Sequence, residues 1–356
     1  MENRQNWLVE VMEMIAPGSL LRDGLENILR AKTGALLVIS NSEEVLGIVD
    51  GGFNINAELT PSRLYELAKM DGAIVLSSDA ERILCANAQL IPEPSISSAE
   101  TGTRHRTAER VARQTGELVI AISQRRDIIS LYKEDKKHVL QDIRVVIAEA
   151  NQAVQTLDKY RSVLDQALTN LSALEFEDLV TIADVVTVIQ RCERVLKIQK
   201  EIERYIGELG NEGRLIKMQL EELVTNVEQE AVLLIKDYIV EEKETAPEEL
   251  LEEIIEWSSD EMLGMNTISK ALGHGGQVNS LDLSITPRGY RLLRKVPRLP
   301  MPVIENLVSH FENLNGILNS SQDELDEVDG VGEVRAQAIK EGLRRLRDQV
   351  LLDRQI

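Results

Sequence analysis

The feature of this sequence that most limits its fold is a long series of apolar residues at alternating steps of four and three. With one place in the series taken by Arg161, these residues are Ile143, Ile147, Ala150, Val154, Leu157, Leu164, Leu168 and Leu171. The spacing puts them on one side of a helix, as a seam that packs against other helices. It predicts a helical bundle in the middle of the chain and argues against a cofactor site there.

The segments on either side of this helical region have different patterns. Before it, short apolar runs alternate with helical patterns, as in α/β domains. The expected strands are residues 35–39, 44–49, 73–76 and 118–122, and the expected helices are residues 61–70 and 108–114. After it, residues 295–307 align with residues 327–339, and each copy has the pattern helix, tight turn, helix. We therefore expect three domains, at 1–138, 139–285 and 286–356.

Composition limits the cell compartment and the partners. The net charge of −20 argues against a protein that coats nucleic acid, but residues 286–356 hold 11 basic and 11 acidic residues and are neutral. Cys85 and Cys192 lie far apart in apolar surroundings, as buried thiols do in a reducing compartment. No apolar run reaches the ~20 residues of a membrane span, and the first residues lack a signal-peptide core. These observations predict a cytoplasmic protein that does not associate with membranes.

The segment Thr-Gly-Thr-Arg-His-Arg-Thr at residues 101–107 predicts an anion site. Arg104 and Arg106 lie near the expected start of a helix, where the peptide dipoles already carry positive charge. Two arginines suit that place if an anion binds to them and to the free N–H groups, and Gly102 allows close approach. A phosphate ligand is the first interpretation. The alternatives are a solvated basic turn and, for His105 alone, an ordinary packed histidine.

Two further positions in the first region are candidates for the same site. Asp71-Gly72 joins an expected helix to an expected strand and by itself suggests only a turn. Beside bound phosphates, however, a carboxylate can hold a divalent cation or accept a proton from a hydroxyl. Ser123 follows another expected strand, where small hydroxyl residues often meet ligands. The phosphate-binding loop of P-loop enzymes is absent from the sequence.

Residues 64–73 (LYELAKMDGA) and 100–110 (ETGTRHRTAER) together resemble the diadenylate cyclase family. The arrangement of the whole chain is similar to the members of that family that scan DNA integrity. The resemblance implies an α/β nucleotide-binding domain with a central mixed sheet, an all-α helical spine and a C-terminal tandem helix-hairpin-helix domain. It also implies the condensation of two ATP to cyclic di-AMP with loss of two pyrophosphates, in a DNA integrity checkpoint.

The resemblance assigns roles to particular residues. Asp71 would hold Mg²⁺ or Mn²⁺ and activate the 3′-hydroxyl of ATP, and Leu90 would form a wall beside the adenine. The residues expected to contact ATP are Gly72, Leu90, Thr103, Arg104, His105, Arg106, Thr107 and Ser123. Because two ATP molecules must face each other, two cyclase domains must meet across a two-fold axis. The expected assembly is therefore a homo-oligomer with face-to-face cyclase domains, an octamer by resemblance.

Residues 328–336 (VDGVGEVRA) resemble the hairpin of helix-hairpin-helix DNA-binding domains. The N–H groups of Gly330 and Gly332 could bind a DNA phosphate without reading the bases. In the first copy Pro300 replaces the second glycine and has no N–H to donate. A run of basic residues without acids supplies the charge: Arg288, Arg291, Arg294, Lys295 and Arg298. The expected DNA contacts are Arg294, Lys295, Arg298, Gly330 and Gly332, on branched or damaged DNA at the nucleoid; the alternative is a hairpin that only packs.

Two other functions remain open at this stage. The chain could be a DNA-binding scaffold or sensor that binds ATP without turnover, although Asp71 and residues 104–106 favour an enzyme. It could also be a nucleotidyltransferase that acts on DNA ends. Such enzymes need two or three carboxylates around their metals, and no such cluster lies near the motif.

Overall fold

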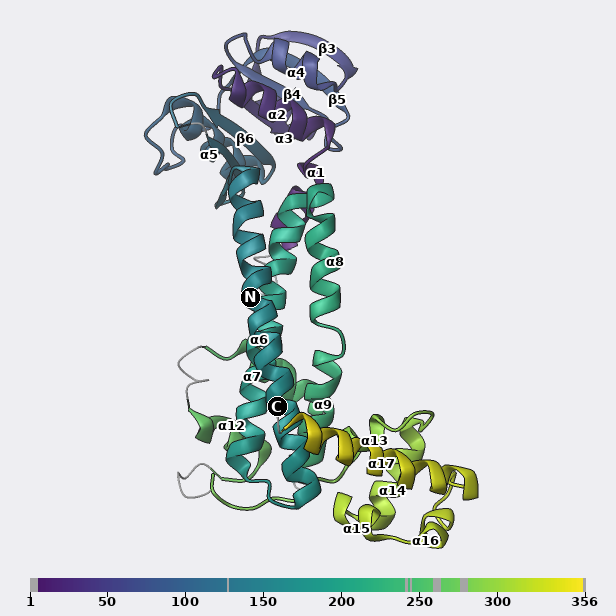
Figure 1. The fold of residues 1–356 in the computed structure, drawn as a ribbon. Helices are drawn as coiled ribbons and strands as arrows, with labels where there is room; N and C mark the ends of the chain where they lie inside the picture. Colours follow the sequence, from purple (N-terminus) through teal and green to yellow (C-terminus); the bar gives the residue numbers. More distant parts are fainter. Residues whose placement is uncertain are drawn as a thin grey trace. The chain divides into compact units, whose positions relative to one another are not determined.

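The computed structural model divides into two compact units, which we describe separately (Figure 1). The structure describes residues 6–126, 128–240, 243, 245–258, 264–275 and 281–354. The first unit consists of Met1–Asn151 with Glu203–Lys217, and the second of Gln152–Ile202 with Met218–Ile356. The boundaries between the three predicted domains stay predictions.

The first unit is built on a mixed sheet of eight strands, which confirms the predicted sheet type. The strand order is β2-β5-β4-β1-β6-β7-β8, and β3 pairs with the other side of β5. Only β1 and β4 pair in parallel, and the remaining described pairs are antiparallel. The strands are β1 Leu36–Ile39, β2 Val49–Asp50, β3 Phe53–Glu58, β4 Ala73–Leu76, β5 Arg82–Leu90, β6 Leu118–Ser123, β7 Ile128–Lys133 and β8 Lys136–Leu140.

Helices cover both faces of this sheet. The helices of the first region are α1 Asn6–Met14, α2 Leu20–Arg30, α3 Glu43–Gly47, α4 Pro61–Leu67 and α5 Thr103–Thr115. Successive side chains of β1 enter different cores, because a strand alternates its faces. Leu37 packs in the core that includes residues of α2 and α4, whereas Val38 packs in the core that includes α5. The sheet is therefore the middle layer of a helix–sheet–helix arrangement, which confirms the α/β prediction.

The expected strand at residues 44–49 is wrong. Residues Glu43–Gly47 form the short helix α3, and only Val49–Asp50 joins the sheet. Ser42 explains the difference, because its Oγ accepts a hydrogen bond from the N–H of Val45 at 3.4 Å and caps the helix. Two glutamates in the first turn further stabilise that helix end.

The middle of the chain is helical, as the apolar series predicts. Its elements are α6 Ile143–Glu177, α7 Ile182–Leu209, the 3-10 helix η2 Gly210–Gly213, α8 Arg214–Leu223, α9 Val227–Tyr238, α10 Pro247–Glu256 and α12 Met265–Leu272. Along α6 the predicted seam is buried from Ala150 to Leu171, and the two isoleucines before it are half-buried. Arg161, the polar member, pairs with Asp165 at 3.0 Å and donates to the carbonyl of Thr225 at 3.2 Å. Among the described residues, no helix is both long and apolar enough to cross a bilayer.

The last part of the chain contains two helical hairpins, in agreement with the repeat in the sequence. The helices are α13 Tyr290–Arg294, α14 Met301–Phe311, α15 Leu314–Asn319, α16 Gln322–Asp326 and α17 Glu333–Asp353. The turns between α13 and α14 and between α16 and α17 have the same backbone shape. Arg298 (φ 63°) and Gly330 (φ 81°), which are 32 residues apart, are both left-handed. Val296 and Val328 are buried at equivalent places.

Candidate functional site

One edge of the mixed sheet collects most of the predicted nucleotide residues. β1 is parallel to β4 and antiparallel to β6, so the start of β4 and the end of β6 lie at the same edge. Asp71 and Gly72 directly precede β4, and Ser123 ends β6. With β1 between them, the two positions are about 10 Å apart by the usual strand spacing. The register of the strands therefore brings together residues that are about fifty positions apart in the sequence.

Asp71 is exposed at this edge, and Gly72 has an internal structural role. Gly72 has a φ of 96°, and a Cβ on it would lie 2.8 Å from the carbonyl oxygen of Ala88 on β5. The turn thus requires glycine even without a ligand. The Asp71 carboxylate makes no hydrogen bond or ion pair within the described ranges, so it is available to an external group.

Helix α5 begins at Thr103, five residues before the predicted helix, so Arg104 and Arg106 do lie near a helix N-terminus. No side chain caps this end, and the N-cap residue Gly102 has ordinary extended dihedrals (φ −83°, ψ 140°). The nearest atom to a Cβ on Gly102 would be Cδ2 of His105, at 3.9 Å. Glycine is a common N-cap residue, and here it leaves the free N–H groups of the first turn open to the close approach of an anion.

The two arginines are held by neutral carbonyls. Arg104 donates to the carbonyl of Ile122, at the end of β6, at 3.4 Å. Arg106 donates through Nε to the carbonyl of Glu100 at 3.3 Å. Because these bonds orient the guanidinium groups without neutralising them, their positive charge remains available to a phosphate. The hydroxyl of Thr107 donates to the carbonyl of Thr103 at 3.0 Å, within the helix.

His105 belongs to a hydrogen-bonded chain with β7 and β8. Tyr132 donates its hydroxyl proton to Glu100 at 3.0 Å, and Lys137 also bonds that carboxylate. The Tyr132 oxygen is then free to accept from Nδ1 of His105, at 3.0 Å. Burial lowers the pKa of His105, which favours the neutral ring. In this tautomer the buried Nε2 has a lone pair, and it has no partner among the described residues.

Glu100, Tyr132 and Lys137 were not predicted as site residues from the sequence. Burial opposes ionisation of Glu100, but hydrogen bonds from Lys137 and Tyr132 outweigh it and lower the pKa of this carboxyl. Burial, with the Glu100 bond, raises the pKa of Tyr132. Glu100 lies beside the motif and could have been suspected. The other two lie on β7 and β8, which had not been predicted as strands.

Two further candidates have less access to a ligand. Leu90 is only 8% exposed and packs in the core shared by the sheet and α5. The oxygen of Ser123 accepts the backbone N–H of Arg126 at 3.2 Å. Contacts of these two residues with ATP stay predictions. Within the described part of the chain, no three His, Cys, Asp or Glu side chains come together as a metal-binding group.

The second hairpin is open to an anion where the first is not. A Cβ on Gly332 would meet no atom within 4 Å, and its φ of −109° is accessible to any residue. The N-terminus of α17, which Gly332 begins, has no side-chain cap. The equivalent N-cap of α14 is Pro300, which has no N–H. Glycine is a common N-cap residue, and at position 332 it also leaves this helix start open to an external phosphate.

The predicted basic run is only partly available to DNA. Arg294 and Arg298 are exposed and have no ion pair or hydrogen bond in the part of the chain that the structure covers. Lys295 lies 3.6 Å from Glu230, and burial with the adjacent Arg291 lowers its pKa. Counting Arg291 among the surface charges was wrong, because its side chain is 0% exposed.

Arg291 is sealed into the second unit by an ionic cluster. Its guanidinium bonds the carboxylate of Glu175 and, at 2.9 Å, the hydroxyl of Ser172, both on α6. Tyr238 donates to the same Glu175 at 2.8 Å. Asp237 caps α13 by accepting three backbone N–H groups, at 2.7, 2.7 and 3.0 Å. The cluster fixes the first hairpin to α6 and α9.

Comparison with known proteins shows the family to which this chain is related. A family model described as DisA bacterial checkpoint controller nucleotide-binding matches residues 22–137, and one described as the DisA linker region matches residues 140–281. A DNA integrity scanning protein DisA from Clostridium botulinum (strain Loch Maree / Type A3) is 57% identical over 98% of both chains. The chain belongs to the DisA family. A DisA from Clostridium tetani is 56% identical over 99% of this chain and 97% of its own.

DisA membership confirms the predicted family and the type of the first domain. The relative from Carboxydothermus hydrogenoformans is also 56% identical, over 96% of this chain and 97% of its own. The nucleotide-binding model spans the sheet edge at Asp71 and the start of α5. The domain is therefore a DisA nucleotide-binding domain of the diadenylate cyclase type.

Proposed function

We propose that this chain condenses two ATP molecules into cyclic di-AMP and two pyrophosphates, and that its C-terminal hairpins bind branched or damaged DNA. The proposed cyclase activity rests on the groups that lie together at one edge of the sheet. There an exposed carboxylate, Asp71, shares an edge with the uncapped start of α5 and the guanidinium of Arg104. An anion site beside a free carboxylate suits phosphoryl transfer.

The reaction forms two ester bonds and breaks two anhydride bonds. Each ATP 3′-oxygen attacks the α-phosphorus of the other ATP, and the bond from that phosphorus to the pyrophosphate leaving group breaks. The 3′-hydroxyl proton passes to Asp71 and then to water. The N–H groups at the start of α5 and the side chains of Arg104 and Arg106 hold the phosphates and offset their charge.

One residue of this site can serve as a ligand for a divalent cation. The exposed, unpaired carboxylate of Asp71 would hold Mg²⁺ or Mn²⁺, and phosphate oxygens and water would complete its ligands. When bound, the ion would neutralise phosphate charge during the transfer. Gly72 holds the Asp71 turn in the required left-handed shape.

The chemistry also requires a second copy of the chain. Two ATP molecules that attack each other must lie antiparallel, so each domain supplies half of a complete site. A homo-oligomer with facing cyclase domains satisfies this requirement, and an octamer is the size that we propose.

The support for DNA binding is the second hairpin. Gly332 and the uncapped start of α17 leave room for a backbone phosphate, and Arg294 and Arg298 add exposed positive charge. Such contacts bind DNA without regard to base sequence. In this proposal the protein works in the cytoplasm, at the nucleoid, and reports DNA integrity through cyclic di-AMP.

One assay tests the enzyme and its alternative. The purified chain is incubated with ATP and Mg²⁺ or Mn²⁺, with and without a four-way DNA junction, and the products are separated by chromatography. We expect cyclic di-AMP and pyrophosphate. ATP binding without product, in a preparation that also binds the junction, would instead support a sensor that binds ATP without turnover.

A further inference from the structure

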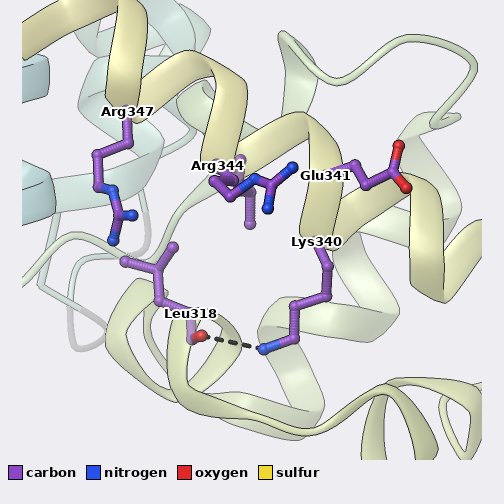
Figure 2. Close-up of a pocket in the computed structure, with 6 residues that line it drawn as sticks. Leu318, Lys340, Glu341, Arg344 and Arg347 are labelled. Atoms are coloured by element: carbon purple, nitrogen blue, oxygen red, sulfur yellow. Dashed lines mark hydrogen bonds between the residues drawn. The ribbon is translucent and has the colours of Figure 1, made fainter.

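A positively charged pocket lies between α17 and the end of α15. Its volume is about 280 Å³. Its lining residues are Leu318, Lys340, Glu341, Leu343, Arg344 and Arg347. Figure 2 shows the three cationic side chains projecting from α17 around the pocket, while Lys340 reaches the carbonyl of Leu318.

The cations of this pocket are only weakly compensated. Arg347 lies 3.8 Å from the carboxylate of Asp348, and such an exposed pair offsets little of its charge. Arg344 is exposed and has no hydrogen bond or ion pair with any other described residue. Lys340 donates to the Leu318 carbonyl at 3.1 Å, a neutral partner that leaves its charge in place. The one carboxylate in the lining, Glu341, is occupied by Arg345 at 2.9 Å and by an amide from Gln337 at 3.0 Å. The pocket therefore carries net positive charge.

The spacing of Lys340, Arg344 and Arg347 forms a row. Steps of four and three keep the three side chains on one side of α17, beside its buried seam of Ile339 and Leu343. At 1.5 Å per residue the row is about 10 Å long. Phosphates of one DNA strand recur every ~3.4 Å along the duplex axis while the strand winds around it, so a straight row of this length can contact at least two neighbouring phosphates.

The second hairpin itself is strongly acidic. Between residues 322 and 334 the chain has no Lys or Arg, and its acids are Asp323, Glu324, Asp326, Glu327, Asp329 and Glu333. A DNA phosphate at Gly332 would therefore lie among like charges, which is unfavourable without cations nearby. The basic row begins eight residues further along α17, about 12 Å from Gly332. Arg335, which donates to the carbonyl of Gly330 at 2.5 Å, is the cation at the hairpin itself. The basic row adds three further cations on the same helix that can offset those acids.

We propose that Lys340, Arg344 and Arg347 form a second phosphate-binding site, which holds the sugar–phosphate backbone of DNA beside the strand at the hairpin. The half-buried side chain of Leu318 would contact a sugar, and the three cations would bind neighbouring phosphates. This site rests on the proposed DNA binding. With this site, much of the favourable electrostatic free energy of DNA binding comes from the middle of α17 and not from the hairpin glycines.

The test is the salt dependence of DNA affinity in the full chain. Binding of a labelled four-way junction is measured by fluorescence anisotropy between roughly 50 and 200 mM salt. The variant K340Q/R344Q/R347Q should flatten the slope of log K against log salt by about two to three, and Arg344→Gln alone by about one. Arg344→Gln removes a side chain without a partner in the structure described, so it should fold normally.

Arg354→Gln is the matched control, because it removes one cation from the end of the same helix, where Arg354 pairs with Glu177 at 3.0 Å. It should leave the slope unchanged. A wild-type slope in the triple variant, while the wild-type chain binds the junction, would overturn the second site and leave the proposed function standing. If the triple variant no longer binds pyrophosphate in calorimetry but keeps the wild-type salt slope for DNA, the second DNA site is also overturned. Lys340, Arg344 and Arg347 would then bind a free oligophosphate. Absence of any junction binding by the wild-type chain would instead refute the proposed DNA function.

Discussion

At the scale of single residues, Asp71 has the least constrained side chain of the candidate site. It is exposed at the sheet edge and makes no contact that would be lost on substitution within the residues described. We expect Asp71→Asn to abolish cyclic di-AMP formation while ATP affinity stays within about tenfold, because binding rests on α5 and not on this carboxylate. Product chromatography and calorimetry measure the two effects. Near-normal turnover in the variant would show that Asp71 has another role.

The arginines at the start of α5 should act on binding. Neutral carbonyls orient Arg104 and Arg106 but leave their charge free. Arg104→Ala or Arg106→Ala should weaken ATP binding by about 1.5–3 kcal/mol, the range for hydrogen bonds to charged groups. Arg113→Ala serves as the control, since Arg113 pairs with Glu109 at 2.8 Å in the last turn of α5. Unchanged affinity in both test variants would return this segment to a solvated basic turn.

His105 should make ATP binding depend on pH. Burial lowers its pKa, so the free protein keeps this ring neutral near pH 6.5, and acidification below its unfolded pKa opposes folding. Bound phosphates favour the charged ring, and ATP binding at about pH 6.5 should take up as much as about one proton. Calorimetry in buffers of different ionisation enthalpy measures this uptake. The same uptake in His105→Gln would assign the proton to another group.

At the scale of helices and strands, sequence patterns predicted the strands made of continuous apolar runs and missed those interrupted by polar residues. The strands at 73–76 and 118–122 are continuous apolar runs, and the structure confirms them. β3 was missed because residues such as Asn54 and Asn56 give it no apolar pattern. Periodicity also gave α5 too late a start, because its first turn is polar. The Glu100–Tyr132–His105 chain depends on the pairing of β6 with β7, which no local pattern encodes.

The junction of α13 with α6 and α9 allows a test of stability at this scale. Arg291 is fully buried with Glu175, so its removal leaves a carboxylate buried without its partner. Arg291→Ala should lower the free energy of unfolding by about 3–5 kcal/mol. Its exposed neighbour provides the control, and Arg294→Ala should change stability by less than about 0.5 kcal/mol. Chemical denaturation measures both, and equal effects would mean that the cluster contributes nothing beyond its surface neighbours.

At the scale of the whole molecule, activity should depend on assembly. If each complete site takes half its groups from a second chain, specific activity must fall when dilution separates the chains. Activity assays and light scattering over the same concentration range should give coincident transitions. A monomer with full specific activity would rule out the face-to-face arrangement.

Arg291 has a consequence for how genes of this kind can recombine. A hybrid that joined residues 1–285 of this chain to hairpins from an unrelated protein would keep Glu175 and Asp237 but lose the arginine and the helix start that satisfy them. Such a hybrid would contain two buried carboxylates, those of Glu175 and Asp237, without these partners. The two hairpins therefore cannot be exchanged as one unit. A functional chimera needs its crossover point upstream of Ser172 or downstream of Arg291, so that both sides of the cluster are inherited together.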